Sequence, residues 1–142
     1  MRTISTILFV LIAITSFSQD LERKIIVGAE RIEQYLPVIS GKRVAIVANH
    51  TSLVGNVHLV DTLISLRVDI NKIFCPEHGF RGNVEAGELI SNHSDTKTGL
   101  PIVSLYGSSK KPKDDHLKDV DLVIFDLQDV GVRFYTYIST MH

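Results

Sequence analysis

The sequence has little of several features that would assign a function directly. Its 142 residues contain one cysteine, Cys75, so the chain cannot form an intramolecular disulfide and an apolar core must hold the fold together. A formal net charge of -1 provides no attraction for nucleic acid or for an anionic membrane surface, and neither is predicted as a partner. The composition, 44% hydrophobic and 22% charged, is that of a soluble globular protein.

The amino terminus lacks the run of about 20 apolar residues that a membrane-spanning helix needs. Uncharged residues fill only positions 3–18, after Arg2, and Ser16-Phe17-Ser18 has the small-x-small pattern of a cleavage site. This pattern predicts a signal peptide over residues 1–18 and an exported protein, periplasmic or extracellular, without stable membrane insertion. A retained anchor is the alternative.

Two common kinds of binding site are also missing from the sequence. The first expected strand runs into Asn49-His50-Thr51-Ser52, which is no glycine-rich phosphate loop, so nucleotide binding is not predicted. No histidines have the spacing of a His-Glu-x-x-His zinc motif. The sequence therefore predicts no metal and no cofactor. The alternative is a metal hydrolase that uses the strand-end residues His50, His78, Asp126 and Asp129.

The sequence does contain alternating strand and helix patterns. Continuous apolar segments predict buried strands at residues 43–48, 72–75, 101–105 and 120–126. Apolar stripes predict helices from Ile25 to Leu36, ended by Pro37, from Val57 to Leu66, and near Asp115 to Lys118. Residues 83–99 lack periodicity and are predicted to be a long functional loop or an insertion. This order predicts an α/β fold with a Rossmann-like parallel sheet flanked by helices.

Polar side chains follow every predicted strand. Since ligands of open parallel sheets bind outside the carboxyl ends of the strands, these side chains are expected to share one crevice. Independent solvent-facing turns are the alternative interpretation. The residues expected at that edge are Asn49, His50, Glu77, His78, Arg81, Tyr106, Asp126, Asp129 and Arg133.

The loop that follows the second strand carries the most chemistry. Pro76 ends the strand, and the glycines at positions 79 and 82 allow the loop to display Glu77, His78 and Arg81. Flanking apolar residues favour a raised pKa for Glu77, as the proton donor of glycoside cleavage requires. An exposed polar turn is the simpler interpretation of this loop.

Other groups remain open for the same chemistry. Asp126 and Asp129 are candidates for a second carboxyl group, although Asp126 could equally brace the following turn. Glu85 and Glu88 are further acids that are more typical of a solvated loop. Cys75 could act as a nucleophile with His78, but a cysteine at the end of an apolar strand is usually buried and inert.

Six motifs, in this order and spacing, resemble the NamZ family of bacterial exo-β-N-acetylmuramidases. They are Asn49-His50-Thr51, Pro76 to Gly82, Glu85-Ala86-Gly87-Glu88, Thr98-Gly99-Leu100-Pro101, Ser104-Leu105-Tyr106-Gly107 and Phe125 to Tyr137. The resemblance covers essentially everything after residue 18. One departure is Glu85, which stands where the family more usually has Asp.

The resemblance implies an enzyme that removes N-acetylmuramic acid from the non-reducing end of peptidoglycan fragments. It also implies a Rossmann-like amino-terminal domain, a smaller carboxyl-terminal domain and a cleft between them. Residues 19–142 would then be the amino-terminal part of the first domain, and the chain alone is expected to be inactive. A binding module for cell-wall sugars that uses the same crevice without turnover is the alternative.

The implied substrate suggests roles for single residues. N-acetylmuramic acid carries a lactyl carboxylate, so Arg81 and Arg133 are candidate clamps, although Arg133 could instead pair with Asp129. Tyr106 and Tyr135 are candidates for sugar stacking or hydroxyl contacts, and Tyr137 is either a third such residue or part of the core. The family motif points to Glu77 as the proton donor, with His78 as its rival or its orienting partner.

Overall fold

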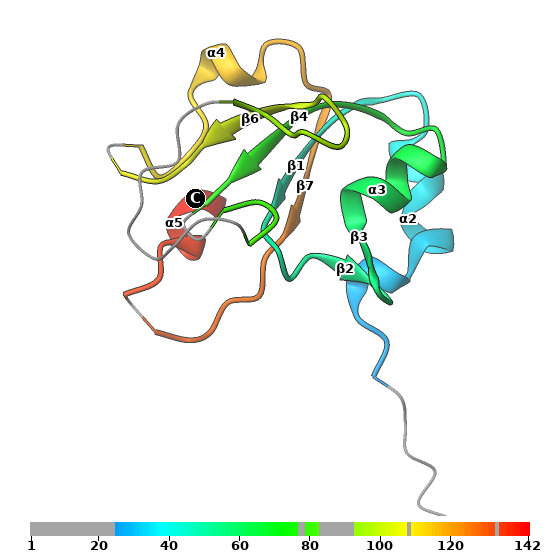
Figure 1. Cartoon of the computed structure of the whole chain (residues 1–142), viewed down its shortest axis with the longest axis horizontal. Coiled ribbons are helices and arrows are strands. Elements are labelled where there is room, and N and C mark those ends of the chain that lie inside the picture. Colours follow the sequence, from blue (N-terminus) through cyan, green and yellow to red (C-terminus); the bar gives the residue numbers. More distant parts are fainter. Residues whose placement is uncertain (1–24, 77–78, 83–92, 108, 133) are drawn as a thin grey trace, which may run out of the picture.

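Figure 1 shows a computed structural model of the chain, which describes residues 25–76, 79–82, 93–107, 109–132 and 134–142. Four parallel strands form most of one sheet: β1 (Arg43–Ala48), β4 (Asp69–Cys75), β6 (Pro101–Ser104) and β7 (Leu122–Asp126). The strand order is β5-β6-β4-β1-β7, in which β5 (His93–Ser94) is an antiparallel edge strand. The predicted α/β fold with a parallel sheet is therefore confirmed.

The two faces of the sheet are packed differently. Val44, Ile46 and Ala48 of β1 alternate toward one face, where they join the main core cluster. The helices α2 (Ile32–Ile39) and α3 (Leu59–Ser65) supply residues to this cluster and lie together on one side of the sheet in Figure 1. The opposite face holds a smaller cluster of Ala45, Val47, Phe74 and Leu105. The short helix α4 (Asp114–Leu117) contacts that face and matches the helix predicted there.

The first helix differs from the prediction. Ile25 is 85% exposed and precedes a short 3-10 turn, η1 (Gly28–Glu30), so it lies outside the apolar stripe. The α-helix begins only at Ile32 and continues through Pro37 to Ile39. Pro37 removes one backbone hydrogen bond, and we attribute the continuation of the helix to the burial of Ile39 in the main core.

The second predicted helix, from Val57 to Leu66, also needs correction at its start. Two short strands, β2 (Leu53–Val54) and β3 (Val57–His58), form an antiparallel hairpin before the helix. Gly55, with φ +59°, lies in the two-residue turn between them. The helix then begins at Leu59, because the Nδ1 atom of His58 accepts a hydrogen bond from the backbone N–H of Val60.

The other elements agree with the patterns to within a few residues. Strand β4 begins three residues before the predicted segment, and β7 begins two residues later. The helix α5 (Tyr137–Met141) was not predicted. In the described part of the chain no helix is both long and apolar enough to cross a bilayer. Residues 1–18 lie outside that part, so the signal peptide stays a prediction.

Candidate functional site

The loops after β1 and β4 meet at the carboxyl edge of the sheet. These strands are direct neighbours, so the residues that follow them emerge side by side. Gly82 adopts φ +77°, and a Cβ atom placed there would lie 3.3 Å from the Cβ of His50. A side chain at position 82 would therefore be strained and crowded, and glycine permits the two loops to approach each other.

Asn49 is the buried centre of this edge. Its Oδ1 atom accepts hydrogen bonds from the N–H (2.9 Å) and the hydroxyl (2.7 Å) of Thr51, and its Nδ2 donates to the hydroxyl of Tyr137 (3.3 Å). Its carbonyl oxygen lies 2.9 Å from Nε2 of His58. Asn49 thus joins the β1 loop to the start of α3 and to α5. The role of Asn49 in substrate binding remains a prediction.

Ser52 connects the ends of β1 and β7. Its hydroxyl donates to the carbonyl oxygen of Asp126 (2.7 Å) and accepts from the backbone N–H of Asn49 (3.1 Å). The chain continues from β1 to β4 and β6 on one side, whereas β7 lies on the other side of β1. The strand order therefore reverses between β1 and β7, which is where open parallel sheets place their ligands.

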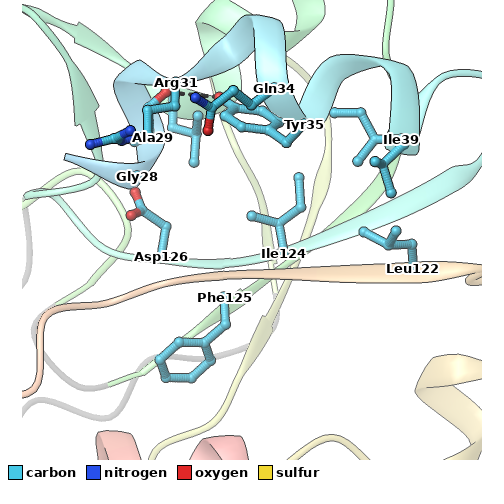
Figure 2. A pocket seen from close by; sticks show the side chains of 12 residues that line it. Gly28, Ala29, Arg31, Gln34, Tyr35, Ile39, Leu122, Ile124, Phe125 and Asp126 are labelled. Carbon is cyan, nitrogen blue, oxygen red and sulfur yellow. Dashed lines mark hydrogen bonds between the residues drawn. The ribbon is translucent and has the colours of Figure 1, made fainter. Parts of the chain in front are cut away.

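The carboxyl group of Asp126 lies at the polar end of an open pocket of about 480 Å³. Figure 2 shows its side chain directed toward Gly28, while Ile124 and Leu122 extend the pocket with apolar side chains. Tyr35 forms part of the opposite wall, and its hydroxyl donates to the carbonyl oxygen of Ala29 (2.8 Å). Burial raises the pKa of Asp126 above its ordinary value. A carboxyl group with this shift can donate a hydrogen bond while it is protonated.

Arg81 forms two bidentate ion pairs. Its Nε and Nη2 donate to the two carboxylate oxygens of Asp95 (2.7 and 2.8 Å), and its Nη1 and Nη2 donate to those of Asp61 (3.1 and 3.0 Å). These bonds occupy four of the five N–H groups of the guanidinium. The guanidinium holds the pKa of Asp95 well below its usual range. The predicted use of Arg81 as a clamp for a substrate carboxylate would have to compete with both partners.

Phe80 links the Arg81 ion pairs to Asn49. The guanidinium carbon of Arg81 lies over its ring, 4.8 Å from the ring centre, and the ring meets that of His58 edge to face with the two centres 4.5 Å apart. Burial lowers the pKa of His58 below its ordinary value. Because Nδ1 of His58 accepts from Val60, the neutral ring donates from Nε2 to the carbonyl of Asn49.

Three other predicted residues lie at the same edge but contact their own segments. Tyr106 follows β6 and is half-buried, with the Lys110 ammonium 5.2 Å from its ring centre. Asp129 accepts from the backbone N–H of Gly131 (2.7 Å) and stabilises that turn. Tyr135 is partly exposed and meets the ring of buried Tyr137 edge to face at 5.6 Å.

Several predicted residues cannot be placed. The proposed acids Glu77 and His78 and the proposed clamp Arg133 lie outside the described residues, as do Glu85 and Glu88. Their assigned roles therefore stay predictions.

The two alternative chemistries gain no support from the residues that are described. Cys75 is fully buried, and burial raises the pKa of its thiol to about 12, so it remains protonated at neutral pH and is a poor nucleophile. Within the described ranges, no three His, Cys, Asp or Glu side chains are grouped so that they could hold a metal ion.

Comparison with known proteins identifies the family. A family model described as the amino-terminal part of the exo-β-N-acetylmuramidase NamZ matches residues 44–142. This chain belongs to the NamZ family. Every site residue predicted from the sequence lies within the matched range, and the resemblance stated from the motifs is confirmed.

One NamZ relative has an assigned activity. The protein of Bacillus subtilis (strain 168) named peptidoglycan β-N-acetylmuramidase NamZ is 42% identical to this chain over 114 residues. The match covers 78% of this chain and 27% of the relative. The chain therefore spans about a quarter of the length of that protein.

Two crystal structures of DUF1343 family proteins from Bacteroides fragilis NCTC 9343 share the fold. One is 46% identical with a TM-score of 0.67, and the match covers 82% of this chain and 29% of that protein. The other is 40% identical with a TM-score of 0.65, with coverages of 77% and 27%. This chain thus has the same α/β arrangement as these proteins over most of its length.

Four polar residues at this edge of the sheet were not predicted from the sequence: Ser52, His58, Asp61 and Asp95. A local signal existed for Asp95, because Thr98 three residues later donates both its N–H and its hydroxyl to the carboxylate. His58 directly precedes a helix, where capping side chains are common. Asp61 had no such signal, since its partner Arg81 is 20 residues away in another element.

Proposed function

We propose that this chain is the amino-terminal part of an exported glycoside hydrolase that acts on peptidoglycan. The observation that carries the proposal is the 42% identity, over 78% of this chain, to a protein named peptidoglycan β-N-acetylmuramidase. The family description adds the exo mode of action. The substrate would then be a muramyl saccharide of the cell wall, and the product N-acetylmuramic acid released from the non-reducing end.

The proposed chemistry is general acid catalysis by a carboxyl group. Glu77 donates a proton to the leaving sugar oxygen, and His78, its neighbour in the sequence, orients it. Arg133 binds the lactyl carboxylate, because the donors of Arg81 are already engaged by two aspartates. The proposed sugar-binding residues at the carboxyl edge are Asn49, His50, Tyr106, Asp126, Asp129 and Tyr135.

The carboxyl edge supports this proposal through its position and charge. Asp126 is the last residue of β7, at the point where the strand order reverses, and burial raises its pKa. A partly buried carboxyl group in an open pocket suits hydrogen bonding to an uncharged sugar hydroxyl better than binding of an anion. Export is part of the same proposal, since peptidoglycan lies outside the cytoplasmic membrane.

The decisive experiment uses the full-length protein. It is incubated with a disaccharide in which N-acetylmuramic acid is β-linked to N-acetylglucosamine, and the products are identified by mass spectrometry. We expect free N-acetylmuramic acid, and far slower cleavage of the corresponding disaccharide of two N-acetylglucosamine units. Binding of the muramyl disaccharide without release of either sugar would instead support a non-catalytic binding module.

A further inference from the structure

The turn that follows β1 presents an exposed histidine at the carboxyl edge of the sheet. The backbone N–H of Ser52 donates to the carbonyl oxygen of Asn49 (3.1 Å), which closes a turn of four residues. His50 and Thr51 are the central residues of this turn and are exposed, whereas Asn49 and Ser52 are buried. His50, one of the proposed sugar-binding residues, therefore lies at the tip of a turn whose two ends are fixed in the protein.

Both ends of the turn are bonded to the start of α3. The Nε2 atom of His58 donates to the carbonyl oxygen of Asn49 (2.9 Å), and the backbone N–H of Leu59 donates to the carbonyl oxygen of Ser52 (2.8 Å). The Asn49 oxygen thus accepts one bond from within the turn and one from a side chain outside it. The bond from His58 depends on the residue type at position 58, whereas the backbone bond from Leu59 does not.

His58 also contacts the loop that runs beside His50. The ring of His58 packs edge to face against Phe80, two residues before Gly82. Gly82 in turn lies so close to His50 that an added Cβ atom would be 3.3 Å from the Cβ of that histidine. His58 itself is only 8% exposed, so we expect it to affect a ligand through the residues that it contacts.

We propose that His58 is a positioning residue, whose bond to the carbonyl oxygen of Asn49 fixes the turn that presents His50 to the saccharide. This inference rests on the proposed function, in which His50 binds the sugar. The same ring also caps α3, because its Nδ1 atom accepts from the backbone N–H of Val60. A test has to separate the bond to the turn from the bond to the helix.

Two substitutions at position 58 each keep one of these bonds. Asparagine has its amide group near the position of Nδ1, so His58→Asn keeps a cap for α3 but cannot reach Asn49. Glutamine is one carbon longer and can donate from near the position of Nε2, so His58→Gln keeps the bond to Asn49 and loses the cap. Both variants lose the ring contact with Phe80, so this contact cannot explain a difference between them.

A second histidine provides the matched control. The Nδ1 atom of His116 also accepts from a backbone N–H, that of Lys113 (3.3 Å). His116 packs against Phe74, however, which belongs to the cluster on the opposite face of the sheet. We therefore expect His116→Asn and His116→Gln to leave ligand binding unchanged.

Two quantities are measured in the full-length protein: Kd for free N-acetylmuramic acid, by calorimetry, and amide exchange of a peptide that contains Ser52, by mass spectrometry. We expect His58→Asn to raise Kd about tenfold and to speed the exchange of the Ser52 amide. His58→Gln should raise Kd less than about threefold, although it removes the helix cap. In a His50→Ala background, His58→Asn should raise Kd less than about twofold further, because both changes act through one turn.

The opposite results would contradict the proposal. Equal losses of binding in His58→Asn and His58→Gln, or a larger loss in His58→Gln, would assign the effect to ring packing or to the helix cap. An unchanged Kd in His58→Asn, or full additivity with His50→Ala, would show that His58 does not act through this turn. If the unsubstituted protein neither binds N-acetylmuramic acid nor cleaves the muramyl disaccharide, the proposed function fails. Exchange of the Ser52 amide would then still show whether His58 fixes the turn.

Discussion

Replacement of Asp95 by asparagine should destabilise the protein far more than the same change at Asp121. Both aspartates accept two bonds from the side chain of one arginine, and Asp121 also accepts from the backbone N–H of Arg43. The Asp95 side chain is 3% exposed, whereas that of Asp121 is 37% exposed. Asp95→Asn leaves Arg81 partly unpaired in a poorly hydrated site. Removal of one partner of a buried pair costs about 3–5 kcal/mol, which we reduce to about 3 kcal/mol because Arg81 keeps Asp61.

The cost should also depend on pH in a defined direction. The pKa of Asp95 is depressed in the folded state, so its contribution to stability is complete above the unfolded-state pKa and decreases as the pH falls toward the folded-state value. With an unfolded-state pKa of about 3.9, the wild-type protein should lose about 1 kcal/mol through this group between pH 6 and pH 3. The difference in stability between wild type and Asp95→Asn should shrink by the same amount.

Hydrogen exchange in the full-length protein measures the loss of stability within the domain that contains Asp95. Exchange of backbone amides in β4 and β6, followed by mass spectrometry over a urea series, reports the opening free energy of this domain separately from the rest of the molecule. Asp121→Asn is the matched control. Equal costs for the two substitutions, or a cost of Asp95→Asn that stays constant from pH 6 to pH 3, would refute the argument.

The remaining predictions concern single residues. Glu77→Gln should lower kcat on the muramyl disaccharide at least about a hundredfold with little change in affinity or melting temperature, and an acidic phenol leaving group should restore much of the rate. If His78→Ala shows that restoration instead, His78 is the donor. Arg133→Ala should weaken binding of N-acetylmuramic acid about ten- to hundredfold but leave N-acetylglucosamine unaffected, and equal losses would indicate a structural role. Burial lowers the pKa of His58 in the folded state, so as the pH falls the unfolded state takes up a proton on this residue before the folded state does. The stability of the folded state should therefore fall as the pH drops below about 6.5. The variant His58→Asn keeps a capping acceptor but cannot be protonated in this pH range. Its hydrogen-exchange protection should therefore decline less than that of the wild type as the pH drops. The Cys75 thiol, with a pKa of about 12, should resist iodoacetamide in the native protein at pH 8 and react after denaturation, and rapid native labelling would contradict its burial.

The sheet could be predicted from the sequence because its signals are local. A run such as residues 43–48 is apolar at nearly every position, and only a strand covered on both faces suits it in a chain of this length. The polar residues after each strand were located in the same way. Parallel strands bring their carboxyl ends to one edge, so a shared edge followed from the fold class, whereas the contact between the β1 and β4 loops also required these strands to be neighbours.

The ends of helices were harder to predict from the sequence where local signals compete. Pro37 is a strong signal for the end of a helix, yet α2 passes through it and ends with Ile39 in the core. The hairpin before α3 was missed because Val57 fits a strand and a helix equally well by its apolar character. In both places the outcome depends on packing against the sheet, which local patterns do not contain.

The sequence by itself determined the fold class, the family motifs and the edge at which polar residues gather. The tertiary structure decided which of these side chains already use their hydrogen-bond donors within the protein. Arg81 reads in the sequence as a guanidinium displayed on a glycine-flanked loop, but folding places it between Asp61 and Asp95, which come from two other elements. Asn49 likewise meets Tyr137, 88 residues further along the chain. Such pairings depend on the strand order and on how the loops pack, and neither is encoded in the residues next to them.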